Sequence, residues 1–498
     1  MSNIRVTYSG LISIAIGIIS IVTGTIFTLI VTRQLLPEEF GTWSLIGSLI
    51  SYVLIIEPII AYWSTRETAR GIESGKTAVV STGIFSCAGL VGYILIALIV
   101  GNSTDADLDT LLFAIVLVPF MFFNRILTAI NLGWKPHAVS YGILTFEVIK
   151  IPSALLMIYF LDLGIHGAIL ATTLAYVGSI ITLVFFAKDK LRGKIQIKFL
   201  KKWLKSFWLT LYPGFSILIP TLDVTVFLII TGNLIGIAYY FAALAISSFV
   251  GQAGLISQAI YSKLLGGGEK SSLQENIIYY FYFSFPLASI SIMLAKPGLF
   301  ALNPIYEVAA PLVIILTVRT FIYTLGKIFD QSLQGLETVD MNENYTFRSL
   351  LGSKLFWLPS VRLIKYVIYV AVLILMLIFT KDFSQIEIVS GWALIALIIE
   401  IPFMIYLKKL VWKNFQIMLP KKRISIFLIA SIIGFGIPYF LMQEFLTYQE
   451  NIIEFLPSVL IYPIIGVLLY LVITFTFDNN TRQLMKLVIN EILRSRKI

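Results

Sequence analysis

Cysteine and histidine are scarce in this chain of 498 residues, which contains one cysteine and two histidines. The single cysteine, Cys87, excludes an intrachain disulfide. With only His137 and His166 available, the sequence cannot assemble a Cys/His metal cluster. Metal hydrolases and redox enzymes are therefore poor candidates, and we expect no cofactor, no metal site and no catalytic site.

Charged residues are also few, at 13% of the chain, whereas a soluble domain has about 25%. Hydrophobic residues reach 58% and aromatic residues 14%. A soluble protein with this composition could not cover its surface with polar groups, because too few are present. The composition predicts a membrane protein.

Apolar runs of membrane-spanning length recur along the whole chain. A bilayer core of roughly 30 Å needs about 20 mostly apolar residues per helix. The run at 11–31 is too long for the apolar part of a signal peptide, so we assign it to the first helix. The sequence predicts fourteen transmembrane helices, at 8–31, 42–63, 77–101, 111–132, 143–161, 167–187, 209–231, 235–262, 277–294, 309–329, 363–380, 388–407, 424–442 and 456–476.

The positive charge follows the predicted topology. With the N-terminus inside, most lysines and arginines fall in cytoplasmic segments, and the outer loops hold only Arg33, Lys296 and Lys381. Lysine and arginine are enriched on the cytoplasmic side of membrane proteins. We therefore expect a multi-pass protein of the cell membrane with both termini cytoplasmic, and we interpret the net charge of +10 as a topology signal and not as a nucleic-acid site.

Two basic segments divide the chain and predict a repeat. Phe40-Gly41 matches Ile235-Gly236, and Arg125 matches Lys327. An even number of helices in each half makes the repeats parallel, as in transporters whose halves rock around a site. The predicted parts are a six-helix lobe at 1–187, a basic linker at 188–208, a second six-helix lobe at 209–407, a basic linker at 408–423, helices 13 and 14 at 424–476, and a cytoplasmic tail at 477–498.

The first linker has a further interpretation. Its lysines alternate with apolar residues such as Ile195, Phe199 and Trp203. This pattern is typical of an amphipathic segment on the anionic cytoplasmic leaflet, although plain topogenic charge would give it too.

Ionisable residues inside the predicted spans are functional candidates, because each costs roughly 2.5–3.5 kcal/mol to place at the bilayer centre. The cations suit a phosphate or pyrophosphate, or they snorkel or pair between helices. The carboxylates are candidates for coupling to a cation or proton; Glu147 and Lys150 could instead neutralise each other, being three residues apart. The candidate cations are Arg125, Lys150, Arg319 and Lys327, and the candidate coupling residues are Glu57, Glu147, Asp223 and Glu400.

No sequence feature predicts ATP hydrolysis. Residues 71–77 are one residue short of a phosphate-binding loop and follow no strand. Any transport energy would come from an ion gradient, the membrane potential or the gradient of the substrate.

The segment Val31-Thr32-Arg33-Gln34-Leu35-Leu36-Pro37-Glu38-Glu39-Phe40-Gly41 resembles the opening signature of the polysaccharide-biosynthesis (Wzx-like, polysaccharide transporter) family of lipid-linked oligosaccharide flippases. That family belongs to a superfamily with multidrug extruders and the lipid II flippase. Residues 59–70, which include Arg66, and residues 327–335 are similar to the same family. Leu36 stands where the family usually has glycine.

The resemblance implies an all-α, V-shaped transporter of two six-helix lobes around a cationic cavity, with alternating access and a groove for a polyprenyl tail on the last two helices. It adds Arg33 and Arg66 to the substrate-binding candidates. The function we expect is flipping of a polyprenyl-(pyro)phosphate glycan from the inner to the outer leaflet, with membrane lipids and a coupling cation or proton as further partners. The alternatives are an ion-coupled multidrug extruder and a membrane glycosyltransferase or O-antigen polymerase. A glycosyltransferase or polymerase would need a metal-binding D-x-D pattern or a large catalytic loop. Asp105-Ala106-Asp107 fits the letters of that pattern but lies on a short outer loop.

Overall fold

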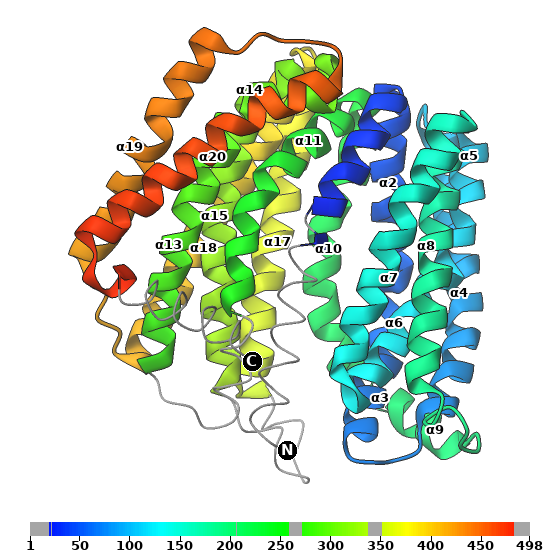
Figure 1. The fold of residues 1–498 in the computed structure, drawn as a ribbon. Coiled ribbons are helices and arrows are strands. Elements are labelled where there is room, and N and C mark those ends of the chain that lie inside the picture. Colours follow the sequence, from blue (N-terminus) through cyan, green and yellow to red (C-terminus); the bar gives the residue numbers. More distant parts are fainter. Residues whose placement is uncertain (1–18, 21, 206, 258–270, 337–350, 483–498) are drawn as a thin grey trace, which may run out of the picture. The chain divides into compact units, whose positions relative to one another are not determined.

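The structure, a computed structural model, describes residues 19–20, 22–205, 207–257, 271–336 and 351–482 (Figure 1). The described residues form helices joined by turns and short irregular segments, and none of them is in a strand. Thirteen of the helices in the described part are long and apolar enough to cross a membrane. The all-α, polytopic fold predicted from the sequence is confirmed. The predicted first helix, 8–31, lies partly outside the described residues; its described residues 19–20 and 22–31 are helical, and the helix continues to 34.

The helices have the following bounds: α2 Pro37–Val53, η1 Leu54–Ile56, α3 Pro58–Ala69, α4 Gly75–Ser103, α5 Leu108–Phe113, η2 Ala114–Val116, α6 Leu117–Trp134, α7 Pro136–Ala154, η3 Leu155–Phe160, α8 Gly164–Ala187, α9 Ile197–Lys205, α10 Phe207–Thr231, α11 Leu234–Ser247, η4 Ser248–Ser257, α13 Ser271–Met293, α14 Ala295–Leu302, η5 Pro304–Ala309, α15 Ala310–Gly335, α17 Lys354–Phe379, α18 Gln385–Phe415, α19 Lys421–Phe445 and α20 Ile452–Phe477.

The chain forms two compact units. The first unit is Met1–Phe241 with Pro359–Val389, and the second is Ala242–Leu358 with Ser390–Ile498. These bounds differ from those of the six-helix lobes expected from the repeat, which stay a prediction. The basic segment predicted at 408–423 begins inside a helix, since α18 continues to Phe415.

The second predicted span is interrupted at Glu57. Helix α2 ends in the short turn η1, and α3 starts at Pro58. Proline has no backbone N–H and is favoured in the first turn of a helix, so the chain restarts there. The interruption leaves Glu57 at a helix junction instead of in the middle of a regular helix.

Leu36 fits its turn without glycine. Its φ is −62° and its ψ 154°, an extended conformation open to any residue. Its backbone N–H donates to Glu39 Oε2 at 2.9 Å and so caps the start of α2. The family's usual glycine is therefore not required for this backbone.

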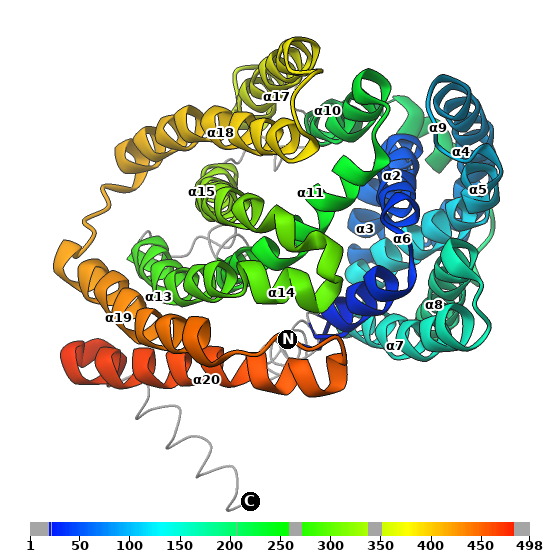
Figure 2. The same ribbon diagram turned by 90° about the horizontal axis from the view of Figure 1, so that it is seen from above.

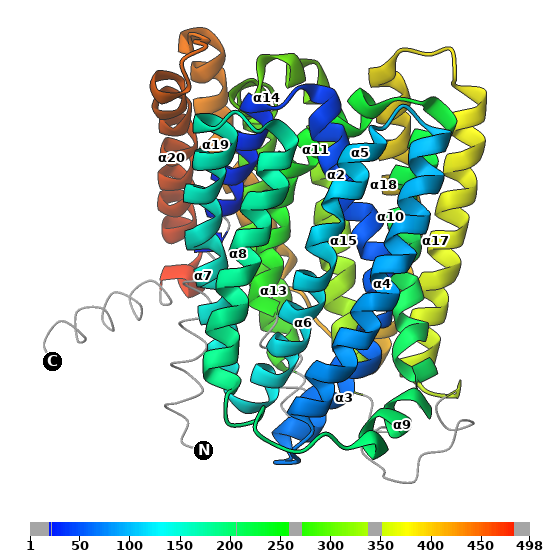
Figure 3. The ribbon, with the colours of Figure 1, turned by 90° about the vertical axis from the view of Figure 1, so that its right-hand side faces the viewer.

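The linker helix α9 is docked on the first unit (Figures 1 and 3). Trp203 is fully buried and belongs to a hydrophobic cluster with Ile60 and Ile126. Lys202 Nζ lies 3.0 Å from Glu67 Oε1 on α3. The sequence suggested a segment lying on the leaflet, but this part of the apolar face packs against the protein itself; Ile195 and Ile197 stay exposed.

In the second unit, α19 and α20 lie side by side and pack with α13 (Figure 2). Tyr470 donates its hydroxyl to the Tyr282 carbonyl at 2.6 Å. Ser289 and Ser431 share a hydrogen bond of 2.9 Å. The two last helices therefore form a hairpin attached to the second unit through α13.

Candidate functional site

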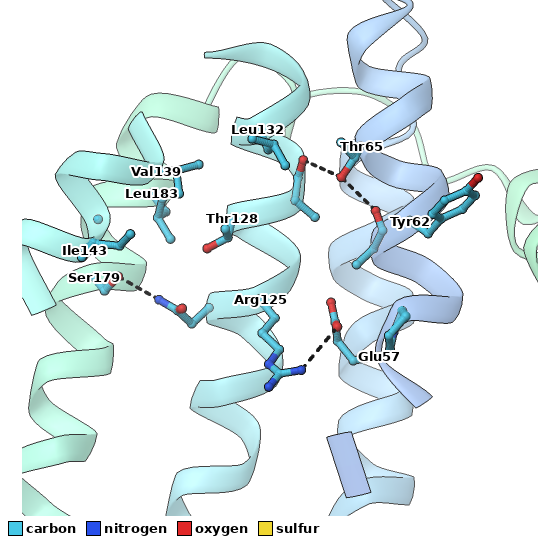
Figure 4. Close-up of a pocket in the computed structure, with 15 residues that line it drawn as sticks. Glu57, Tyr62, Thr65, Arg125, Thr128, Leu132, Val139, Ile143, Ser179 and Leu183 are labelled. Atoms are coloured by element: carbon cyan, nitrogen blue, oxygen red, sulfur yellow. Dashed lines mark hydrogen bonds and ion pairs between the residues drawn. The ribbon is translucent and has the colours of Figure 1, made fainter. Parts of the chain in front are cut away.

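A cavity of about 500 Å³ lies in the first unit, among α3, α6, α7 and α8 (Figure 4). We call it the Arg125 cavity. Helices α3 and α6 approach closely beside it, and Gly133 permits this approach: an added Cβ there would lie only 2.4 Å from the Thr65 carbonyl oxygen. Thr65 Oγ1 also donates to the Ala129 carbonyl of α6 at 3.0 Å.

Arg125 and Glu57 point toward each other across this cavity (Figure 4). Arg125 Nη1 lies 3.9 Å from Glu57 Oε2, and the two side chains are 47% and 8% exposed. The guanidinium is therefore accessible from the cavity, while the carboxylate is held inside. The sequence proposed the two residues for separate roles, and the structure brings them into one site.

Further polar groups line the same cavity. Asn124 Nδ2 donates to Ser179 Oγ at 2.8 Å and joins α6 to α8. Thr128 lies one turn after Arg125, and its hydroxyl makes no hydrogen bond with the described residues. The Arg125 cavity therefore offers donors, acceptors and one compensated charge pair.

A second cavity, of about 430 Å³, lies in the second unit. Arg319 and Lys327 both line it from α15, and Tyr323 stands between them on the same helix. Residues 319, 323 and 327 are spaced by four, so they share one face of the helix. Gln331 continues this face by one more turn. We call this the Lys327 cavity.

Glu147 and Lys150 form a buried ion pair on α7. Lys150 Nζ lies 2.6 Å from Glu147 Oε2, and each side chain is 10% exposed. Thr23 donates to the same carboxylate oxygen at 2.7 Å. Lys150 also lies over the rings of Phe27 and Phe146, 5.2 and 5.0 Å from their centroids. The self-neutralising pair that the spacing left open as an alternative is present.

Asp223 is buried in α10 and accepts hydrogen bonds there. Tyr369 of α17 donates its hydroxyl to Asp223 Oδ2 at 2.7 Å, and the Val224 backbone N–H donates to Oδ1 at 2.8 Å. Glu400 is buried in α18, and an added Cβ on Gly326 would lie 3.9 Å from its Oε1. Glu400 therefore lies beside the α15 turn that carries Lys327.

Arg33 and Arg66, the two residues taken from the family signature, line neither cavity in the described structure. The Arg66 guanidinium lies 4.8 Å from the centroid of the Tyr62 ring, and Tyr62 lines the Arg125 cavity. Arg33 is half-buried just before α2. Arg66 thus lies beside a residue that lines the Arg125 cavity, and a role for Arg33 stays a prediction.

Sequence reasoning missed the uncharged members of these sites. Thr23, Thr128, Ser179 and Tyr369 are polar residues on apolar helices, which is a weak signal because membrane helices commonly contain them. Their roles depend on neighbours distant in sequence, as in the Tyr369–Asp223 hydrogen bond.

No family model matches this chain, and no curated protein does. Solved structures do match. An inward-facing multidrug resistance MATE family transporter of the MOP superfamily has 14% identity and a TM-score of 0.62, covering 82% of this chain and 99% of that one. The MATE multidrug transporter DinF-BH has 14% identity and a TM-score of 0.57, with 82% and 95% covered. The lipid II flippase MurJ, in an inward closed conformation, has 15% identity and a TM-score of 0.67, with 95% and 100% covered. This chain has the fold of MOP-superfamily transporters.

Proposed function

We propose that the protein is a lipid-linked oligosaccharide flippase of the cell membrane, which moves a polyprenyl-(pyro)phosphate glycan from the inner to the outer leaflet by alternating access. Both termini would be cytoplasmic. The protein would perform no chemistry on its substrate. Its task would be to carry an anionic, sugar-bearing head across the bilayer, a transfer that hydrocarbon alone prevents.

The Lys327 cavity is the observation that carries this proposal. Arg319 and Lys327 supply two cations on one helix face, and none of the described residues lining the cavity is a carboxylate. Arginine offers a planar fork and lysine a point charge to phosphate oxygens. A cationic cavity in an apolar helical fold favours an anionic head group over the lipophilic cations that many drug pumps carry.

The comparisons add support of a coarser kind. The match to the lipid II flippase MurJ covers 95% of this chain, and the match to the multidrug transporter DinF-BH covers 82%. The signature at 31–41 and the hairpin of α19 and α20 also favour a flippase over an extruder. The hairpin would offer the groove for the polyprenyl tail.

An ion-coupled multidrug extruder is the second candidate, and buried carboxylates favour it. Asp223 lies on α10 after Pro213 and Pro220, and Tyr369 donates a hydrogen bond to it. A buried carboxylate inside a membrane protein is a candidate for cation or proton coupling. The same residue could couple a flippase, so Asp223 and Glu400 remain coupling candidates under both functions.

Charge removal in the Lys327 cavity tests the proposal. Arg319→Gln and Lys327→Gln should each slow translocation of a polyprenyl-pyrophosphate oligosaccharide in proteoliposomes about 10- to 100-fold, since each removes a hydrogen bond to a charged group of roughly 1.5–3 kcal/mol. Lys296→Gln is the matched control, because Lys296 lies outside both cavities and pairs with Glu307. Wild-type translocation by the double Arg319→Gln/Lys327→Gln variant would exclude the cation site.

A further inference from the structure

The two cavities differ in charge although Arg125 and Lys327 hold matching places in the predicted repeat. The Arg125 cavity has one cation and one carboxylate, 3.9 Å apart. The Lys327 cavity has two cations and no carboxylate among the described residues that line it. A pyrophosphate bound in the Arg125 cavity would lie beside the Glu57 carboxylate, and like charges at such distances repel. Of the two cavities, the Lys327 cavity therefore suits the phosphates better.

We infer that the Arg125 cavity binds an uncharged sugar residue of the transported glycan. This inference rests on the proposed function and assigns a separate substrate portion to this cavity. Sugar hydroxyls donate and accept hydrogen bonds at once, so a sugar site needs both kinds of partner close together. A cavity with one balancing charge pair and a few further polar groups meets this need without attracting anions.

The partners are present on the cavity wall. The Glu57 carboxylate accepts hydrogen bonds, and the Arg125 guanidinium, 47% exposed, donates them. Asn124 is oriented by its bond to Ser179, which leaves its carbonyl oxygen to accept. The Thr128 hydroxyl is without a hydrogen bond in the described part of the chain, and it lies on the cavity surface one turn from Arg125.

The remaining wall suits the carbon skeleton of a sugar. Leu132, Val139, Ile143 and Leu183 supply aliphatic surface on the other side of Thr128 (Figure 4). The volume of about 500 Å³ falls within the range of roughly 300–1,000 Å³ of small-molecule sites. Specific sites of this type combine apolar walls with a few placed polar groups.

Thr128→Val is the cleanest test, because it removes a hydroxyl that has no hydrogen-bond partner among the described residues and keeps the side-chain volume. We expect it to raise the KM for a polyprenyl-pyrophosphate disaccharide about 2- to 10-fold, because one neutral hydrogen bond is lost. The double variant Asn124→Ala/Thr128→Val should raise this KM further. The KM for polyprenyl pyrophosphate without sugar should change less than about twofold. Thr145→Val/Thr182→Val is the control, since it removes a polar pair between α7 and α8, 3.0 Å apart, that does not line the cavity.

The outcomes separate this inference from the proposed function. Equal KM changes for the sugar-bearing and sugar-free lipids, or no change for either, would overturn the sugar site while the effect of Arg319→Gln and Lys327→Gln still stood. Loss of transport of both lipids in the Arg319→Gln/Lys327→Gln variant, together with a sugar-selective effect of Thr128→Val, supports both. Absence of lipid translocation by the wild-type protein would refute the flippase itself.

Discussion

At the scale of single residues, Glu147 and Lys150 show how an intramembrane charge can be structural. Both side chains are 10% exposed, and their charged atoms lie 2.6 Å apart. Thr23 and the rings of Phe27 and Phe146 also contact the pair. Such a pair contributes little net stability, but removing one partner leaves a buried charge.

Glu147→Gln should therefore destabilise the protein by about 3–5 kcal/mol, because the Lys150 ammonium would stay buried without its carboxylate. Removing both charges in Glu147→Leu/Lys150→Met should restore a thermal midpoint near that of the wild type in detergent. A double variant as unstable as Glu147→Gln would contradict this account. If Lys150 also contacts the substrate, the double variant will fold normally yet fail to transport.

The sequence was sufficient to find the charged residues but not their partners. The cost of burying an ion singles out Glu57, Arg125 and Asp223 wherever they occur in an apolar run. Which group becomes the partner of each ion depends on helix packing, as for Glu57 with Arg125 and Tyr369 with Asp223. Single hydroxyls in membrane helices are too common to be recognised from the sequence alone.

At the scale of elements, helix ends follow local signals that the hydrophobic runs do not contain. Asp107 caps α5: its carboxylate accepts from the Thr110 backbone N–H at 3.0 Å and from the Thr110 hydroxyl. Hydrogen bonds from Thr110 hold the pKa of Asp107 below its ordinary value. The capped turn defines where the chain re-enters helix after Ser103.

Asp107→Ala should cost about 0.5–2 kcal/mol of stability, the usual effect of losing an N-cap, and Asp107→Asn should retain most of it. Because the folded pKa is lowered, the ionised cap contributes its full stability above the ordinary aspartate pKa, and this contribution is lost as the pH falls through the folded value. Thermal melting of the wild type and the Ala variant between pH 7 and pH 3 checks this. A stability difference that does not shrink in acid would contradict it.

Most helices could be predicted from the apolar runs, but their ends could not. The break at Pro58 was foreseeable, since proline removes a backbone donor. Helix α7 starts at Pro136, earlier than the apolar run, because proline is favoured in the first turn and the first residues need not be apolar. Helix α18 continues through Lys408 and Lys409, where a linker was expected, because lysine is a good helix former.

At the scale of the whole molecule, composition and positive-charge bias predicted a polytopic fold, and the similarity to MOP-superfamily transporters agrees with it. The two cavities could not be predicted, because helix packing and not the repeat pattern decides which residues share a cavity. The repeat did match Arg125 with Lys327, and each of these lines a cavity in its own unit.

The predicted orientation can be measured by cysteine labelling. Cys87 is exposed on α4, so Cys87→Ser provides the background. A membrane-impermeant maleimide should label Asp105→Cys in intact cells and should label Lys194→Cys only after permeabilisation, because the basic linker is expected on the cytoplasmic side. The reverse pattern would place both termini outside.

The most direct measurement of the central claim is transport by the purified full-length protein in liposomes. One assay follows a polyprenyl-pyrophosphate oligosaccharide as it becomes accessible to a membrane-impermeant glycosidase, and a parallel assay follows efflux of a lipophilic cationic dye. We expect the glycolipid to cross faster than in protein-free liposomes, with Arg319→Gln/Lys327→Gln abolishing the gain and no dye efflux. Dye efflux with glycolipid crossing at the protein-free rate would contradict the flippase and favour the extruder.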